Sequence, residues 1–252
     1  SNINFEGFKA NIISSKSIKT KINVDEKEIY ITSNSPREWI LIKDASVGDW
    51  SIFFNENQLK NDNFKNSSRF NKRGLTGCLN FYKTKFSNTN IDINNSSCED
   101  GLNIMNSEGR LNRLEIKNAS SDGVDLDFSV INLNQINISN SGNDCLDVSG
   151  GKYFLKDGFF KNCTDKAFSI GEKSKVDIDN IKIESSNIAV SVKDYSTVKI
   201  KSISTNDTNI CIESKQKKQE FGGASAIILN NDCQSALISD ENSSIKFITN
   251  EL

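Results

Sequence analysis

The sequence of 252 residues contains no histidine, a single proline (Pro36) and a single methionine (Met105). The lack of histidine excludes every acid–base, nucleophilic or metal site that depends on an imidazole. A Cys-x-x-Cys motif is also missing, so a metal site built on cysteine is not expected. The scarcity of proline and the abundance of Ile, Ser and Asn agree with β structure, and few stretches carry a helical amphipathic pattern.

The sequence also lacks a strong charge bias and a long apolar run. Its 31 basic and 33 acidic residues give a formal net charge of -2, which provides no general case for a nucleic-acid partner. No run of 18 apolar residues occurs, so no membrane-spanning helix is predicted. Residues Ser1 to Phe5 carry no basic-then-apolar signal, so the signal of an exported protein would have been removed or lie in a longer parent chain. Without a glycine motif in a strand–helix context, we expect no nucleotide or redox cofactor.

What the sequence does contain is a repeat of 22 residues between Cys98 and Ser196. Two apolar columns recur at this period with a polar column between them: Leu102, Val124, Leu146, Phe168 and Val190; Ile104, Leu126, Val148, Ile170 and Val192; and, between these, Asn103, Asp125, Asp147, Ser169 and Ser191. Apolar–polar–apolar alternation is strand periodicity, and a fixed period of this length is typical of a stacked solenoid. The sequence therefore predicts an all-β fold, a single-domain parallel β-helix of roughly ten coils.

We expect one structural domain with three regions: N-terminal coils or a cap over residues 1–76, a regular core over 77–214, and C-terminal coils or a cap over 215–252. Short strands are predicted at 29–32, 39–42, 50–54, 226–229 and 245–248, and polar loops at 55–74 and 215–223. A second sheet is predicted from a further apolar column, which runs through Leu111, Leu133 and Leu155, slips by one residue, and continues at Ile178 and Ile200.

The six cysteines fall in three sequential pairs, each separated by close to one coil: Cys78 and Cys98, Cys145 and Cys163, and Cys211 and Cys233. Two interpretations remain open. Each pair could form a disulfide between neighbouring coils of an exported protein. Alternatively, all six could be buried thiols in the interior of the solenoid.

Carboxylates are concentrated at outward positions of the repeated strand. Asp122, Asp125, Asp127, Asp144 and Asp147 fall on two adjacent coils, with Glu99 and Asp100 one coil before them. One interpretation is a Ca²⁺ site formed by Asp122, Asp125, Asp144 and Asp147. A second is a general acid and base for glycoside hydrolysis. A third is structural: aspartates bond the N–H groups of turns, and flanking lysines neutralise them.

Lysines follow the carboxylates along the predicted rod, at Lys166, Lys173 and Lys193. They could form simple ion pairs, or they could bind a carboxylated sugar or act as a base with a lowered pKa. The candidate catalytic residues are therefore Asp125, Asp144, Asp147, Lys166, Lys173 and Lys193. The candidate substrate-binding residues are Asp127, Glu172, Asp194 and Tyr195.

Three tracts, at residues 142–149, 165–174 and 192–196, resemble the right-handed parallel β-helix of the pectin-lyase-like superfamily, and within it a group of bacterial proteins. The resemblance extends over nearly the whole chain at the level of architecture. It implies that the protein cleaves, epimerises or binds polysaccharides on the outer face of one parallel sheet. The histidine-dependent hydrolase and epimerase mechanisms of that superfamily are not transferable here, whereas lyases that use Ca²⁺ with an arginine or lysine base remain compatible.

We therefore expect a secreted or cell-surface protein, with the periplasm as an alternative, that binds an acidic glycan or acts on it as a lyase or hydrolase. Ca²⁺ is the one candidate cofactor, and a polysaccharide is the expected partner. The alternative is a non-catalytic structural or adhesive module of a longer surface protein or of a homo-oligomer. A third, intracellular interaction role is disfavoured by the cysteine pairs.

Overall fold

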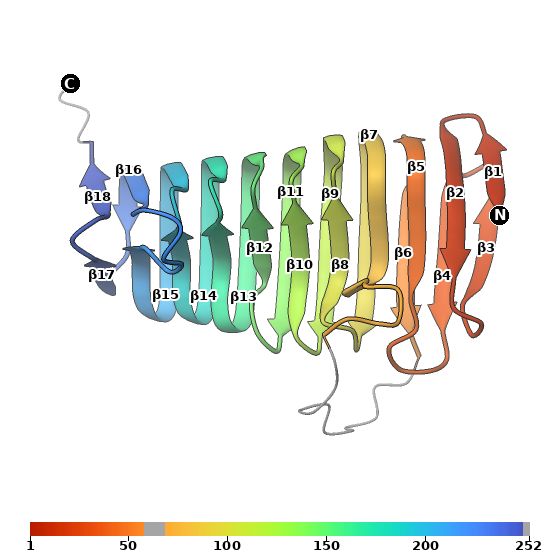
Figure 1. The fold of residues 1–252 in the computed structure, drawn as a ribbon, viewed down its shortest axis with the longest axis horizontal. Helices are drawn as coiled ribbons and strands as arrows, with labels where there is room; N and C mark the ends of the chain where they lie inside the picture. The colour runs from red at the N-terminus through yellow and green to blue at the C-terminus, as the bar shows by residue number, and fades with distance from the viewer. Residues whose placement is uncertain (58–68, 249–252) are drawn as a thin grey trace.

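The computed structural model describes residues 1–57 and 69–248 of the chain. Over this range the strands form one continuous 18-stranded sheet, which winds into a right-handed parallel β-helix of about 10 turns with about 22 residues per turn (Figure 1). The predicted fold class is therefore confirmed. Within these residues, no helix is long and apolar enough to cross a membrane.

The strands succeed one another along the rod in chain order (Figure 1). The first six are β1 (Asn2–Phe5), β2 (Phe8–Ser14), β3 (Lys19–Asn23), β4 (Glu28–Ser33), β5 (Ile40–Gly48) and β6 (Ser51–Glu56). The next six are β7 (Gly77–Ser96), β8 (Asp100–Met105), β9 (Glu108–Ala119), β10 (Asp122–Asp127), β11 (Val130–Ser141) and β12 (Leu146–Ser149). The last six are β13 (Lys152–Gly171), β14 (Lys175–Lys193), β15 (Thr197–Lys215), β16 (Ser225–Asp232), β17 (Ala236–Ser239) and β18 (Ser244–Phe247).

The register of the parallel strands follows the predicted columns. Val124 lies opposite both Leu102 and Leu146, and the slip of one residue occurs where Leu155 pairs with Ile178. These apolar side chains are fully buried in one core that runs the length of the rod. Burial of successive apolar rungs, each stacked on the next, is what holds a solenoid together.

The N-terminal region combines parallel coils with antiparallel strands. The predicted strands at 29–32, 39–42 and 50–54 correspond to β4, β5 and β6, and β4 and β5 already pair in parallel with β6 and β7. In contrast, β1 pairs antiparallel with β2, β2 with β5, and β3 with β4. These antiparallel strands cover the end of the parallel ladder, which would otherwise expose unpaired backbone groups.

The two predicted polar loops lie at opposite ends of the core. Of the loop at 55–74, residues 55 and 56 belong to β6, residues 58–68 lie outside the described range, and the rest precedes β7. The second loop connects β15 to β16. The C-terminal strands at 226–229 and 245–248 correspond to β16 and β18, and the structure adds β17, which carries no clear strand pattern in the sequence.

All six cysteines form disulfides, in the three sequential pairs Cys78–Cys98, Cys145–Cys163 and Cys211–Cys233. The alternative of six buried thiols is therefore wrong. Disulfides persist in oxidising compartments and are rare in the reducing cytosol, so the three bonds indicate a non-cytosolic location.

Candidate functional site

The sequence-predicted site residues lie on the outer side of the first strand of each coil and in the turns that precede and follow this strand. This acidic face consists of β8, β10, β12 and the final residues of β13, β14 and β15. Its central row, in register from coil to coil, is Asn103, Asp125, Asp147, Ser169, Ser191 and Glu213. Because neighbouring parallel strands lie about 4.8 Å apart, each position in this row is one short step from the next.

Asp125 and Asp147 occupy consecutive positions in the central row. Neither carboxylate forms a hydrogen bond or ion pair with any other described residue, although both side chains are half-buried. Burial, reinforced by the charges of Asp100, Asp127 and Asp147, raises the pKa of Asp125 well above its usual range. Asp125 therefore keeps its proton to a higher pH than an exposed aspartate does, which makes it the candidate proton donor of the pair.

Two further carboxyls lie beside this pair. Asp127 accepts a hydrogen bond of 3.3 Å from the Asn103 side-chain amide, and burial raises its pKa to about 6. Asp100 is 1% exposed, and neither of its carboxylate oxygens has a hydrogen-bond partner among the described residues. Burial raises the pKa of Asp100 well above its usual range, and the nearby Thr76 hydroxyl acts in the opposite sense.

Asp122 and Asp144 differ from the others because their carboxylates bond the backbone of the next coil. Asp122 accepts hydrogen bonds from the backbone N–H of Asp144 at 2.9 Å and from the Asn143 amide at 2.7 Å. Asp144 accepts one from the backbone N–H of Lys166 at 3.0 Å. Burial still raises the pKa of Asp122 to about 7. The structural interpretation therefore fits these two aspartates, which join consecutive turns.

Lys166 is engaged in ion pairs. Its Nζ lies 3.2 Å from Asp144 and also contacts Asp165. Burial lowers the pKa of Lys166, but hydrogen bonds and charges from Asp165 and Asp144 outweigh that effect and raise it overall. A lysine held in its charged form is a poor base, so the geometry favours the ion-pair interpretation for Lys166.

Lys193 has the opposite character. It is buried, its Nζ donates a hydrogen bond of 2.6 Å to Ser169 Oγ, and no carboxylate lies within ion-pair distance among the described residues. Burial lowers the pKa of Lys193, with the charge of Asp147 acting in the opposite sense. A lysine with a lowered pKa is the form in which this residue serves as a base. Ser169, its partner, was predicted as part of the polar row but not as a site residue.

Glu172, Lys173, Asp194 and Tyr195 hold the loop between β15 and β16. Asp194 accepts hydrogen bonds from the backbone N–H groups of Lys217 and Lys218 at 2.7 and 2.9 Å, and Glu172 pairs with the Lys218 side chain. Lys173 Nζ lies 5.6 Å from the centre of the Phe221 ring, which Tyr195 meets edge-on. Asp194 and Glu172 are thus occupied in anchoring the loop, whereas Tyr195 remains 55% exposed.

Exposed aromatic rings border the acidic face. Phe128, which follows Asp127, is 58% exposed, and its ring packs directly over Gly150 of the next coil. Tyr195 lies at the equivalent corner three coils later, about 14 Å away at strand spacing. Sequence reasoning missed Phe128, although a bulky apolar residue at a position filled by Asn106 and Gly150 in neighbouring coils was a detectable signal.

The predicted Ca²⁺ site can be compared with the geometry of the carboxylates. Among residues 1–57 and 69–248, no three side chains of Asp, Glu, Cys or His lie close enough together to hold a metal ion. The carboxylates of Asp122 and Asp144 also accept hydrogen bonds from backbone N–H groups. Ca²⁺ binding at Asp122, Asp125, Asp144 and Asp147 stays a prediction.

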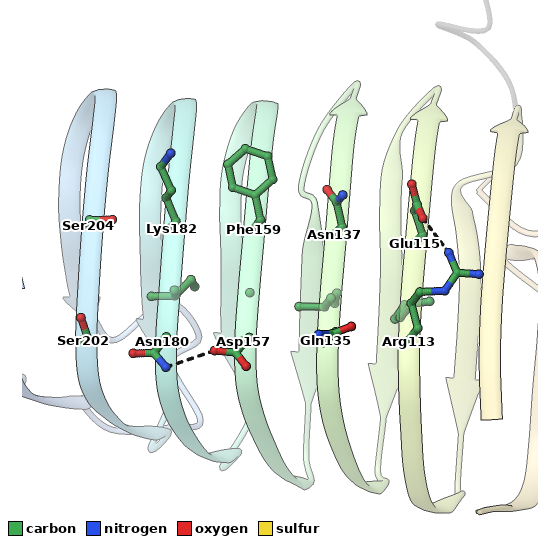
Figure 2. A pocket seen from close by; sticks show the side chains of 14 residues that line it. Arg113, Glu115, Gln135, Asn137, Asp157, Phe159, Asn180, Lys182, Ser202 and Ser204 are labelled. Carbon is green, nitrogen blue, oxygen red and sulfur yellow. Dashed lines mark hydrogen bonds and ion pairs between the residues drawn. The ribbon is translucent and has the colours of Figure 1, made fainter. Parts of the chain in front are cut away.

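A second surface feature, which sequence reasoning missed, lies on the outer side of β9, β11, β13, β14 and β15. It is an open groove of about 430 Å³ (Figure 2). Two rows of outward side chains line it: Arg113, Gln135, Asp157, Asn180 and Ser202, and, parallel to them, Glu115, Asn137, Phe159, Lys182 and Ser204.

No family model matches the chain, and neither a curated protein nor a solved structure matches it. A parallel β-helix is a scaffold on which unrelated functions can be placed, so the fold alone assigns none. The function of this chain therefore has to follow from its own side chains and their arrangement.

Proposed function

We propose that the protein binds an acidic polysaccharide along the acidic face and hydrolyses its glycosidic bonds with Asp125 and Asp147. One observation carries this proposal: two half-buried carboxylates on consecutive coils that have no hydrogen-bond or ion-pair partner among the described residues. Buried polar groups are ordinarily paired, and unpaired carboxylates cluster where they act on a ligand.

In this reaction Asp125 is the general acid and Asp147 its partner. Asp125 transfers its proton to the glycosidic oxygen as the bond from that oxygen to the anomeric carbon breaks. Asp147, as a carboxylate, either takes a proton from the attacking water or attacks the anomeric carbon itself. Water supplies the hydroxyl of the new reducing end in both cases. The raised pKa of Asp125 supports its assignment as the acid.

The rest of the face suits a chain of acidic sugars. Lys173 lies beyond the carboxyls along the rod, where its exposed side chain would neutralise a sugar carboxylate. Phe128 and Tyr195 provide exposed rings on which sugar faces can pack, at a separation that fits a short oligosaccharide. We infer from this arrangement that the chain is a pectin-lyase-like β-helix that works outside the cytoplasm, at the cell surface or in the medium.

The test is incubation with a panel of acidic and neutral polysaccharides, with reducing ends measured over time. We expect new reducing ends, and a loss of rate of about 10²- to 10⁴-fold in Asp125→Asn and in Asp147→Asn. The matched control is Asp179→Asn, an isosteric change in a surface ion pair with Lys201 on another side of the coil. Wild-type rates in both site variants on a cleaved substrate would contradict the assignment.

The lowered pKa of Lys193 favours a second candidate, a polysaccharide lyase. Here neutral Lys193 removes the proton from the sugar carbon next to the carboxylate, and the bond to the glycosidic oxygen breaks as a carbon–carbon double bond forms. The leaving oxygen takes a proton from water and becomes a hydroxyl group. Unsaturated products absorb ultraviolet light, which distinguishes them from hydrolysis products. In that case Lys193→Gln abolishes activity, and a chelator reveals whether Ca²⁺ assists.

The backbone bonds of Asp122 and Asp144 favour the third candidate, a non-catalytic module of a longer surface protein or of a homo-oligomer. It predicts no turnover on any glycan of the panel. It also predicts that Asp125→Asn changes the stability of the protein and leaves glycan binding unchanged. Binding and unfolding measured on the same samples distinguish this candidate from the two enzymatic ones.

A further inference from the structure

We propose that the groove over β9, β11, β13, β14 and β15 is a second carbohydrate site, which binds a neutral oligosaccharide along the rod axis and is independent of the acidic face. The groove belongs to a different side of each coil from the acidic face, because its rows lie on the last segment of the coil and the acidic row on the first. Its ligand therefore needs neither Asp125 nor Lys193.

The groove offers hydrogen-bonding groups that no other described residue uses. The side chains of Gln135, Asn137, Ser202 and Ser204 have no hydrogen-bond partner within the described part of the chain. Amides and hydroxyls both donate and accept, which matches the hydroxyl groups around the edge of a sugar ring. Their spacing follows the strands, about 4.8 Å per coil, so equivalent groups recur along a ligand that runs with the rod.

Phe159 supplies the apolar surface in the middle of the groove, between Asn137 and Lys182 in the same row (Figure 2). Its ring is half-buried, and the Lys182 ammonium lies 5.5 Å from the ring centre. An aromatic ring flanked by a few polar groups is the usual composition of a small-molecule site, and the ring packs well against the C–H face of a sugar.

The charges of the groove cancel, which points to a neutral ligand. Two cations, Arg113 and Lys182, face two carboxylates, Glu115 and Asp157. Arg113 pairs with Glu115 at 2.8 Å, and Asp157 accepts a hydrogen bond of 3.1 Å from the Asn180 amide (Figure 2). Lys182 pairs with Glu184 at 2.8 Å outside the groove. Both cations of the groove are thus paired with carboxylates, so neither is left to select a phosphate or a uronic acid.

The same row continues beyond the groove toward the N-terminus and ends in two more aromatic residues. Glu115 follows Asp92, Phe53 and Tyr30 in register, and the rings of Tyr30 and Phe53 stack 4.9 Å apart. Tyr30 is 39% exposed. Aromatic surface at two places in one row suits an extended polymer better than a single small molecule, because both places can be contacted at once.

The experiment is calorimetric titration of the full chain with cellohexaose, maltohexaose, xylohexaose and chitohexaose. We expect at least one of them to bind, Phe159→Ala to weaken that binding by about tenfold or more, and Phe159→Trp to retain it. The matched control is Phe247→Ala, which removes an exposed ring from the C-terminal coil and leaves affinity unchanged. Gln135→Ala and Asn137→Ala, at exposed unbonded side chains, weaken binding without affecting the fold.

The proposal is overturned if none of the four hexasaccharides binds, or if binding is the same in Phe159→Ala, Gln135→Ala and Asn137→Ala as in the wild type. Cleavage or binding of acidic polysaccharides is measured in parallel. If no acidic polysaccharide is bound or cleaved, the proposed function of the acidic face is overturned and the result for the groove stands. If no neutral hexasaccharide binds, the proposal for the groove is overturned and the result for the acidic face stands.

Discussion

Four carboxyls of the acidic face, those of Asp100, Asp122, Asp125 and Asp127, keep their protons to a higher pH in the folded protein than in the unfolded chain. Burial raises the pKa of Asp122 to about 7 and that of Asp127 to about 6, and it raises the pKa values of Asp100 and Asp125 as well. Unfolded aspartate titrates near pH 3.9, so between about pH 4 and 7 the folded state binds more protons than the unfolded state. Stability therefore falls as pH rises through this window.

We predict that the free energy of unfolding decreases from pH 4.5 to 7.5, by about 3 kcal/mol for Asp122 taken alone and by less where neighbouring carboxyls share the charge. Asp125→Asn should flatten this slope and stabilise the protein at pH 7 by about 1–3 kcal/mol, with no gain near pH 4. Urea unfolding at a series of pH values measures both. Identical slopes in wild type and variant would show that Asp125 is not a buried acid.

Other carboxyls affect the pH dependence of stability in the opposite direction, because their pKa values are lowered in the folded protein. Hydrogen bonds and charges from Lys117 and Arg113 lower the pKa of Glu115, against the effect of burial. Hydrogen bonds from Lys182 and Lys161 do the same for Glu184. Their stabilising effect is present above the unfolded pKa and is lost below it, so stability also falls at strongly acidic pH.

Tyr153 provides a second prediction at the scale of a single residue. Its hydroxyl, buried at the corner beside Gly151, donates toward the Leu126 carbonyl at 2.9 Å and accepts from the Ser129 N–H at 3.4 Å. In neighbouring coils a serine occupies the position that Gly151 has in this coil, as at Ser107, Ser129 and Ser174. Tyr153→Phe leaves buried backbone groups unpaired and should cost about 1–3 kcal/mol in urea unfolding.

The control for this prediction is Tyr82→Phe, at a half-buried tyrosine whose hydroxyl has no hydrogen-bond partner among the described residues. Its effect should stay within about 0.5 kcal/mol. Equal losses in the two variants would mean that the Tyr153 hydroxyl does not replace the missing serine.

At the scale of elements, an asparagine ladder fixes one corner of the coils. Asn95, Asn118, Asn140 and Asn162 each have a positive φ, between 54° and 63°, and each side-chain amide after the first donates to the side-chain oxygen of the one before. Asparagine tolerates this left-handed conformation better than most residues, and the ladder satisfies amide groups between coils.

We predict that Asn140→Ala lowers the free energy of unfolding by about 1–2 kcal/mol, because it combines the left-handed backbone with the loss of two amide hydrogen bonds. Asn140→Gly removes the strain of the left-handed backbone but also loses the amide hydrogen bonds. Its free energy of unfolding should therefore lie between those of Asn140→Ala and the wild type. Ser139→Ala is the neighbouring control, and thermal unfolding ranks the three. A glycine variant no better than the alanine variant would assign the whole effect to the amide ladder.

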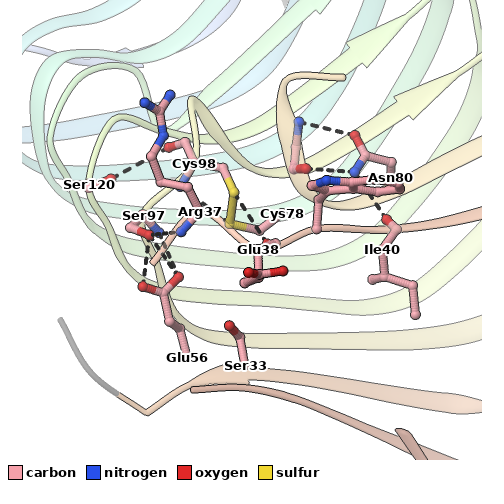
Figure 3. Close-up of a disulfide and its surroundings, with 12 residues drawn as sticks. Ser33, Arg37, Glu38, Ile40, Glu56, Cys78, Asn80, Ser97, Cys98 and Ser120 are labelled. Carbon is pink, nitrogen blue, oxygen red and sulfur yellow. Dashed lines mark hydrogen bonds between the residues drawn. A yellow bond between two sulfur atoms is a disulfide. The ribbon is translucent and has the colours of Figure 1, made fainter. Parts of the chain in front are cut away.

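At the scale of the whole molecule, the three disulfides join coils at the start, the middle and the end of the parallel core. Figure 3 shows Cys78–Cys98 beside Ser97, which donates to the buried Glu56 at 2.7 Å and links the first coils. Cys145–Cys163 lies on the coils that carry Asp144 and Asp147. Because each coil contacts only its neighbours, a disulfide in a solenoid supports local structure more than distant structure.

We predict that the double variant Cys145→Ala with Cys163→Ala loses roughly 2–4 kcal/mol of stability and weakens ligand binding at the acidic face. The matched variant Cys211→Ala with Cys233→Ala, at the C-terminal end, should lose similar stability and leave the Asp125–Asp147 pair intact. Hydrogen exchange locates the loosened coils in each case. Uniform loosening of the whole rod in both variants would contradict local support.

The sequence by itself determined the fold, the register and which residues share a row. A period of 22 residues with strand alternation leaves one way to bury the apolar columns, and that way places Asp125 over Asp147 and each cysteine near its partner. The slip at Leu155 and Ile178 was also readable, because the columns themselves record it.

Only the tertiary structure decided which outward side chains form hydrogen bonds or ion pairs within the protein and which could contact a ligand. Asp122 and Asp144 accept hydrogen bonds from backbone N–H groups, and Lys166 pairs with acids. Lys193 reaches Ser169 on the neighbouring coil, two residues along the strand. The columns of the sequence reveal none of these contacts. The groove around Phe159 was likewise not predicted, because side chains of five coils line it together. The period of the sequence determines on which face of the sheet a side chain lies. Its rotamer, its burial and its hydrogen bonds determine where its charged group lies and what that group contacts.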